Sequence, residues 1–170
     1  MLKLIYAPDP ILKKESVSIP QVDNHHRELI KQMYEIMYSA NGVGLAAPQI
    51  GLNICIFVLD AGARDEEKKP ITMINPKIIS LHEKKVPYEE GCLSFPEHFA
   101  EIDRPEKIKI EYLDEDNSKK ISAFTGFESR IIQHELDHLN GILFVDHLSR
   151  LKRDVIIRKM RKYKKEKEII

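Results

Sequence analysis

The chain has 170 residues and no net charge, and 42% of its residues are hydrophobic and 32% charged, which suits a single globular domain over 1–170 and excludes disordered and fibrous proteins. Cys55 and Cys92 are its only cysteines, too few for a disulfide framework, so we expect a reducing compartment. It shows no signal-peptide pattern and no stretch of ~20 apolar residues, and we therefore expect a cytoplasmic protein without a membrane partner.

The first half of the chain predicts one helix and two strands. Leu29, Met33 and Ile36 recur at helical spacing, and apolar, β-branched runs of strand length follow. Pro76 interrupts the second run, and we expect it to break the strand because proline removes a hydrogen-bond donor. The expected elements are a helix over 22–39, a strand over 53–59, a charged surface loop over 60–69 and a strand over 71–80.

The second half predicts a hairpin and two helices. Residues 107–124 alternate apolar and polar side chains on both sides of an acidic turn, as in two paired strands. Apolar residues around Gln133–His138 suit a helix, and Asn140 and Gly141 tolerate the left-handed conformation that ends one. Runs of strands with separate helices indicate an α+β fold. The expected elements are strands over 107–112 and 120–124, a helix over 126–140, and a basic helix from about Leu148.

The segment Gln133–His138 contains an HExxH motif. His134 and His138 are four residues apart and project from one face of a helix, so their nitrogens can converge on one divalent metal. Glu135 stands beside them as a group that can handle a proton. Taken alone, the motif leaves open two ordinary histidines of an amphipathic helix.

Two histidines leave a metal short of ligands, so we expect a third ligand elsewhere in the chain. Cys92 lies in the glycine-containing segment Glu89–Ser94, which we expect to be irregular, and a thiolate binds borderline and soft divalent metals well. Taken alone, a cysteine such as Cys92 is more often a structural thiol than a metal ligand. Cys55 lies within the apolar strand expected over 53–59 and is expected to be a small buried hydrophobe. Candidates downstream of the motif are Asp146, His147 and Asp154.

A third segment, 42–51, combines glycines and alanines with Gln49. Small residues allow the backbone to approach a neighbour or ligand closely, and the Gln49 amide offers a donor. Together with the two segments above, it resembles the peptide deformylase family, which is marked by GxGxAAxQ, EGCxS and QHExDH motifs in this order. The matching segments are Gly42–Gln49, Glu90–Ser94 and Gln133–His138.

The resemblance extends over nearly the whole chain. It implies antiparallel strands wrapped around a central metal-binding HExxH helix, with one helix towards the N-terminus and one at the C-terminus. It also implies a metal-dependent hydrolase that removes the formyl group from the N-terminal formyl-methionine of newly made polypeptides and releases formate.

The resemblance assigns catalytic roles by position. One divalent metal is bound with water in its fourth place; Fe(2+) is the expected native ion, and Zn(2+), Ni(2+) or Co(2+) can occupy the same site. Glu135 takes the proton of the water and passes it to the leaving amine. The Gln49 amide and the Leu93 backbone N–H meet the formyl oxygen, where negative charge grows. The implied metal ligands are Cys92, His134 and His138.

The resemblance also places a pocket for the methionine side chain beside the metal, with core packing as the alternative for its apolar members. Arg104 is expected either to pair with Glu90 or to be a solvated surface charge. Phe99 departs from some members, which have a basic residue there that can touch the peptide; Phe99 either stacks on the substrate or merely packs. The expected substrate-binding residues are Val43, Gly44, Glu90, Gly91, Phe127 and Ile131, beside His134.

Charge is separated along the chain. Residues 150–170 carry ten Lys and Arg against three acids, a net charge of +7, so residues 1–149 carry −7. A basic tail indicates an anionic partner, and the resemblance implies ribosomal RNA and protein near the exit tunnel. A solvated helix with one face packed on the body is the alternative. The self-contained site favours a monomer.

Two other functions compete with this prediction. A metallopeptidase that cuts ordinary peptide bonds shares the HExxH motif, but Cys92 beside a glycine favours the deformylase. A catalytically silent ribosome-binding module would be expected to lose Gln49, Cys92 or Glu135, and the chain keeps all three.

Overall fold

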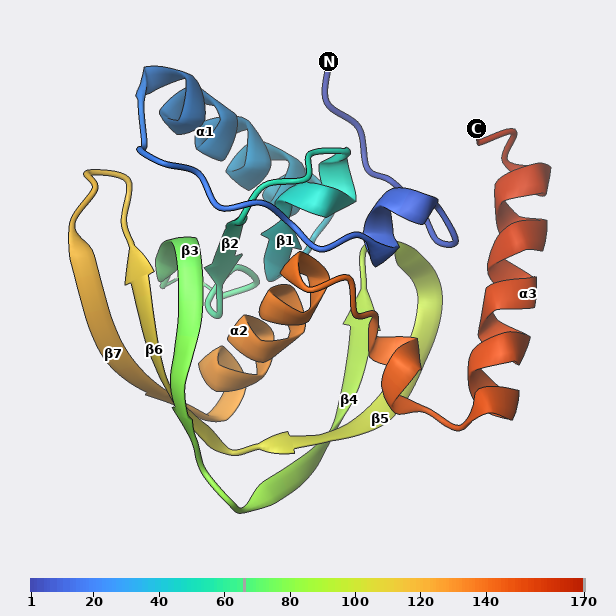
Figure 1. Ribbon diagram of the computed structural model, residues 1–170. Coiled ribbons are helices and arrows are strands. Elements are labelled where there is room, and N and C mark those ends of the chain that lie inside the picture. Colours follow the sequence, from blue (N-terminus) through green and yellow to red (C-terminus); the bar gives the residue numbers. More distant parts are fainter. Residues whose placement is uncertain (66, 170) are drawn as a thin grey trace.

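The computed structural model describes residues 1–65 and 67–169, which form three α-helices, seven strands and three short 3-10 helices (Figure 1). This mixture of separate helices and antiparallel strands confirms the α+β prediction. The elements in chain order are η1 (Pro10–Lys13), α1 (Asn24–Ser39), β1 (Gly44–Ala46), η2 (Ala47–Ile50), β2 (Ile56–Asp60), β3 (Pro70–Leu81), β4 (Lys85–Cys92), β5 (Phe95–Pro105), β6 (Lys107–Leu113), β7 (Lys119–Thr125), α2 (Gly126–Leu139), η3 (Phe144–His147) and α3 (Arg150–Glu166).

The strands form two antiparallel sheets around α2. Five strands pair in the order β1-β2-β3-β6-β7, and β4 pairs with β5 in a separate ribbon. Helix α2 lies in the middle of the molecule between these two sheets, in contact with β1, β2, β6 and β7 (Figure 1). Within residues 1–65 and 67–169, β1 pairs only with β2 and β4 only with β5, so each strand leaves one edge unpaired.

Helix α1 begins two residues later than expected and ends where expected. Asp23 accepts a hydrogen bond from the His26 backbone N–H, and the His26 side chain accepts one from the Asp23 backbone, which forms a capping box. Its buried face packs on the five-stranded sheet through Met33 and Met37. Asn41, with φ of 57°, reverses the chain after Ser39.

Helix α2 is buried on most of its surface. Ile131, Ile132 and Leu139 join the core, and several polar side chains of the same helix are also buried. Gly141, with φ of 70°, ends the helix as predicted, and a Cβ there would lie 2.5 Å from the Lys13 carbonyl oxygen. Each buried polar side chain of this helix needs a hydrogen-bond partner. Several of these partners belong to the site described below.

Three local predictions were wrong. Pro76 does not break its strand, because β3 runs unbroken from Pro70 to Leu81 and absorbs the proline in a register shift between Ile74 and Lys77. Asp60 is not in a surface loop; it ends β2, fully buried, and accepts hydrogen bonds from Tyr38 and from the backbone of Gly62. Cys92 ends strand β4 instead of lying in an irregular segment, although the register breaks directly before it.

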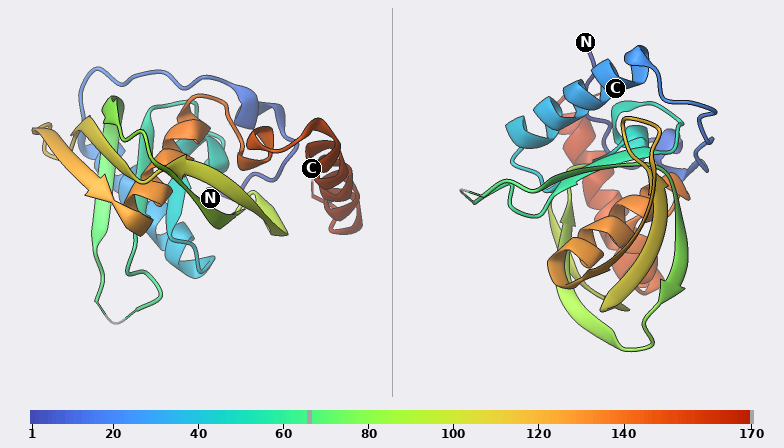
Figure 2. Two further views of the ribbon diagram at one scale, coloured as in Figure 1. Left: turned by 90° about the horizontal axis from the view of Figure 1, so that it is seen from below. Right: turned by 90° about the vertical axis from the view of Figure 1, so that its left-hand side faces the viewer.

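Helix α3 begins at Arg150, two residues after the predicted start, with Ser149 as its N-cap. In the left-hand view of Figure 2 it lies to one side of the strands. Met160 is buried against a cluster that contains Phe95 and Phe144, which attaches the helix to the body. Among the residues that the structure describes, no helix is long and apolar enough to cross a membrane.

Candidate metal centre

Three predicted ligands meet where α2 faces the end of β4. One ligand atom each of Cys92, His134 and His138 lies within 4.8 Å of the other two. Sγ of Cys92 is 3.3 Å from Nε2 of His138, and the two imidazole rings are 5.1 Å apart. Burial lowers the pKa of His138 well below its ordinary value, which favours the neutral ring that a metal requires.

A carboxylate orients the second histidine. Oε1 of Glu90 lies 2.9 Å from Nδ1 of His134, so in the neutral ring Nδ1 carries the proton and Nε2 is the nitrogen available to a metal. The three ligands therefore offer one sulfur and two nitrogens, the donors that borderline divalent cations prefer. The residues fit a single metal ion.

Glu90 is held in turn by two arginines. Arg104 donates two hydrogen bonds to its carboxylate, at 2.6 and 3.0 Å, and Arg130 donates a third at 2.8 Å. Burial favours the neutral acid, but the hydrogen bonds from His134 and Arg104 hold the pKa of Glu90 well below its usual range. The pairing of Arg104 with Glu90 was one of the two alternatives for that arginine and is confirmed.

Glu135 lies beside the ligands on the same helix. It is 4% exposed, and burial raises the pKa of its carboxyl group to about 7. Its Oε2 has no hydrogen-bond partner among residues 1–65 and 67–169. A Cβ at Gly44 would lie 2.5 Å from its Oε1, so the glycine makes room for this carboxylate. The chain thus keeps a buried acid available to exchange a proton with a ligand.

Gln49 reaches the site from η2. Its Oε1 accepts a hydrogen bond from the Ala46 backbone N–H at 2.9 Å, which fixes the orientation of the amide. Its Nε2 donates to Sγ of Cys92 at 3.4 Å and to Oγ of Ser94 at 3.2 Å. The amide donor therefore faces the cysteine ligand.

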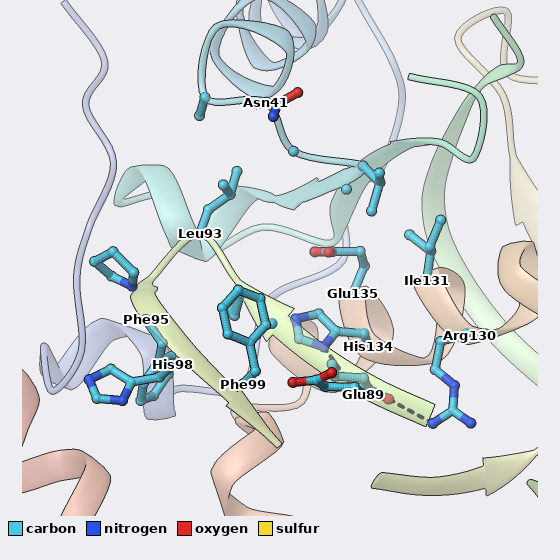
Figure 3. A pocket seen from close by; sticks show the side chains of 18 of the residues that line it. Asn41, Glu89, Leu93, Phe95, His98, Phe99, Arg130, Ile131, His134 and Glu135 are labelled. Atoms are coloured by element: carbon cyan, nitrogen blue, oxygen red, sulfur yellow. Dashed lines mark hydrogen bonds and ion pairs between the residues drawn. The ribbon is translucent and has the colours of Figure 1, made fainter. Parts of the chain in front are cut away.

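A cavity of about 400 Å³ opens beside the ligands. Figure 3 shows Glu135 and Ile131 projecting into it from α2, with Leu93 and Phe99 opposite. Every predicted site residue except His138 lines this cavity, so the structure brings the three motifs together. The predicted residues on its wall are Val43, Gly44, Gln49, Glu90, Gly91, Cys92, Leu93, Phe127, Ile131, His134 and Glu135.

The downstream ligand candidates have other partners. His147 lies 2.8 Å from a carboxylate oxygen of Asp137, and Asp146 accepts hydrogen bonds from Lys13 and from the Leu143 backbone. Asp154 is exposed on α3, with Arg150 and Arg153 near it. None of these three belongs to the metal-ligand group found within the described part of the chain.

The sequence prediction missed two residues of the site. Ser94 is fully buried and contacts Gln49, and it already stood inside the EGCxS motif, which is the signal that could have found it. Arg130 is buried and also donates to the carbonyl oxygens of Ile102 and Val86. Its sequence context is an apolar helix face, so no local signal marked it.

Comparisons with known proteins agree with this geometry. The family model described as Polypeptide deformylase matches residues 1–154. The chain is similar to the peptide deformylase of Rhizobium meliloti (strain 1021), with 45% identity over 159 residues that cover 94% of this chain and 91% of the relative.

Solved structures give the same result. A peptide deformylase from Legionella pneumophila has a TM-score of 0.91 and 39% identity, with 99% of this chain and 98% of that chain covered. A peptide deformylase from Synechococcus elongatus in complex with actinonin has a TM-score of 0.87 and 40% identity, with 93% and 86% covered.

Proposed function

This chain belongs to the polypeptide deformylase family, and from this premise we propose a role for each residue at the metal centre. It is a hydrolase that removes the formyl group from the N-terminal formyl-methionine of newly made polypeptides and releases formate. The observation that carries the proposed roles is the meeting of Cys92, His134 and His138 beside the buried carboxylate of Glu135.

Cys92, His134 and His138 would hold the metal. When bound there, a divalent cation supplies the Lewis acidity that makes water a nucleophile near neutral pH. We propose ferrous iron as the native ion, with zinc, nickel or cobalt able to replace it, because one thiolate and two imidazoles suit all four. The contact between Nδ1 of His134 and Glu90 orients that ring, so that Nε2 is the nitrogen offered to a metal.

Glu135 is the proposed general base and acid. It accepts a proton from the attacking water and delivers it to the amine that leaves. A carboxyl group with a pKa of about 7 is suited to both steps near neutral pH. Its unpartnered Oε2 supports this role, since that oxygen is not engaged by the residues that the structure describes.

Gln49 and Leu93 are the proposed donors to the formyl oxygen. The hydrogen bond from the Ala46 backbone N–H to Oε1 of Gln49 keeps Nε2 of the amide directed towards the site. One N–H of Nε2, which donates to Cys92 without substrate, would then donate to the formyl oxygen. The backbone N–H of Leu93, directly after the cysteine, is the second donor. Losing one such donor typically raises the barrier by about 3–4 kcal/mol.

The substrate binds between two unpaired strand edges. Gly44 in β1 and Gly91 in β4 line the same cavity, and an extended peptide between them would add a strand to both sheets. Val43, Phe127 and Ile131 receive the methionine side chain. Glu90 contributes only its aliphatic part to this pocket, because its carboxylate already accepts four hydrogen bonds.

We further propose that 1–170 forms one catalytic domain that works as a cytoplasmic monomer, since the site is complete within a single chain. The basic C-terminal helix over 148–170 is proposed to contact ribosomal RNA and protein near the tunnel exit. The net charge of +7 over residues 150–170 and the exposure of most cations on α3 support this contact.

An anaerobic assay with two peptides tests the proposed function. Formyl-Met-Ala-Ser and acetyl-Met-Ala-Ser differ only in the group to be removed, and we expect formate from the first and no acetate from the second. Chromatography of both reactions also detects cleavage between Ala and Ser. Release of acetate at a comparable rate, or cleavage of the internal peptide bonds, would favour the metallopeptidase instead.

A further inference from the structure

Phe99 is an exposed aromatic residue on the wall of the substrate cavity. Phe99 is 63% exposed, more than any other large apolar residue that lines this cavity. Figure 3 shows its ring among the side chains that line the cavity. The roles proposed above for the metal centre do not use it.

The register of the two-stranded ribbon explains where the ring lies. Phe99 in β5 is paired directly with Gly91 in β4. A Cβ at Gly91 would lie 2.6 Å from Cε1 of Phe99, so the ring lies across the glycine, where any other residue would place a side chain. The ring therefore extends over β4 towards its unpaired edge.

The alternation of side chains along β4 shows on which face of the β4–β5 ribbon the Phe99 ring lies. The Glu90 side chain points towards α2, where it contacts His134, so the neighbouring position, Gly91, faces the other way. A peptide bound along the free edge of β4 must alternate in the same manner. If its methionine side chain enters the pocket on the α2 side, its second side chain lies on the face that carries the Phe99 ring.

We propose that Phe99 is a specificity-determining residue that selects an apolar or aromatic side chain at the second position of the substrate. Across three strands in register, the ring of β5 reaches over Gly91 and contacts the substrate side chain opposite it. Offset or edge-to-face packing of two aromatic rings then favours a second residue such as phenylalanine. This inference rests on the proposed binding of the peptide along β4.

The test compares kcat/KM for formyl-Met-Phe-Ala with that for formyl-Met-Ala-Ala in the native enzyme and in Phe99→Ala. We expect the native enzyme to prefer phenylalanine at the second position by about 2- to 10-fold, and the preference to disappear in Phe99→Ala. Phe99→Leu keeps Gly91 covered but removes the ring, so it separates loss of aromatic contact from loss of strand structure. We expect Phe99→Leu to retain only part of the preference.

The third substrate position provides an internal control. Its side chain points to the opposite face, so the ratio between formyl-Met-Ala-Phe and formyl-Met-Ala-Ala should be the same in the native enzyme and both variants. A second-position preference that survives in Phe99→Ala, or a change at the third position alone, overturns the inference. Absence of formate from every peptide would overturn the proposed function itself, and this inference with it.

Discussion

One carboxylate, that of Glu90, accepts two hydrogen bonds from Arg104, one from Arg130 and one from His134. A buried carboxylate of this kind destabilises the fold when one of its partners is removed, because part of the buried charge is then left without a counter-charge. Glu90 thereby couples a metal ligand on α2 to both strands of the β4–β5 ribbon. Its contribution to the site is the orientation of His134, and only its aliphatic part is proposed to contact the substrate.

Glu135→Gln tests the proton transfer. The amide has nearly the shape of the carboxylate but cannot accept the proton, so we expect turnover to fall by about 100- to 10,000-fold with full metal content. Formate release and metal analysis on the same preparation measure both quantities. Glu101→Gln, an exposed change on β5, is the matched control and should keep native turnover. A Glu135→Gln enzyme with more than a tenth of native turnover would contradict the assignment.

Gly44→Ala tests how closely the backbone must approach Glu135. The added Cβ would lie 2.5 Å from Oε1 and 3.0 Å from Cγ and Cδ of that residue, so the carboxylate has to move. We expect kcat to fall by about 100-fold, the lower range for loss of a general base, while the metal stays bound. Loss of metal together with activity would indicate a structural role for Gly44 instead.

Among the secondary-structure elements, those with a regular apolar pattern could be predicted. Each end of helices α1 and α2 and of strands β6 and β7 lies within two residues of its expected position. Strands β4 and β5 were not predicted. Half of the residues of β4 are exposed and only Glu90 is buried, so its pattern lacks a buried apolar face. β3 was divided in two, since the sequence cannot show that a bulge will accommodate Pro76.

The candidate site likewise contains residues that the sequence could predict and residues that it could not. Cys92, His134 and His138 could be found because their spacing and motif neighbours are local in sequence. The network behind them joins Glu90 to Arg104, 14 positions away, which was predicted only as one of two alternatives, and to Arg130, 40 positions away, which was not predicted. No periodicity records such contacts, because they are created only when the β4–β5 ribbon folds against α2.

The contact between α1 and the five-stranded sheet predicts a late tyrosine titration. Tyr38 donates to Asp60 at 2.5 Å, and burial together with this carboxylate raises the pKa of Tyr38 to about 12. Because the folded pKa is raised, this stabilising contribution is complete below about pH 10 and is lost as the pH rises through about 12. Ultraviolet titration of the native enzyme, Tyr38→Phe and denatured protein measures it. If the tyrosine signal lost in Tyr38→Phe is one that titrates near pH 10 in the native enzyme, the raised pKa of Tyr38 is contradicted.

On the scale of the whole molecule, α3 has one face that packs on the body and one face that carries exposed cations. Met160 anchors the helix beside Phe95 and Phe144, so truncation after Arg150 would also uncover part of the core. Replacement of exposed cations is therefore the better test of the proposed ribosome contact. The body carries a compensating charge of −7, which leaves the helix as the main cationic surface.

Replacing four exposed cations of α3 by glutamine should weaken ribosome binding and lower the salt dependence of that binding. Each lost phosphate contact reduces the slope of log K against log salt by about 0.7 to 0.9. Activity on formyl-Met-Ala-Ser should stay unchanged. The variant carries Arg158→Gln, Arg161→Gln, Lys162→Gln and Lys165→Gln.

The control removes the same charge from exposed lysines of the body. It should bind ribosomes with nearly the native salt slope, and equal weakening by both variants would reduce the contact to a general effect of net charge. The control carries Lys77→Gln, Lys85→Gln, Lys107→Gln and Lys109→Gln.

Anaerobic titration of the metal-free enzyme with Fe(2+) or Co(2+) tests the proposed centre most directly. Formate release from formyl-Met-Ala-Ser should rise linearly and stop rising at one ion per chain, and Cys92→Ala should show neither the rise nor tight binding of the ion. Full activity in the metal-free enzyme, or an unchanged titration in Cys92→Ala, would contradict a single metal held by Cys92, His134 and His138.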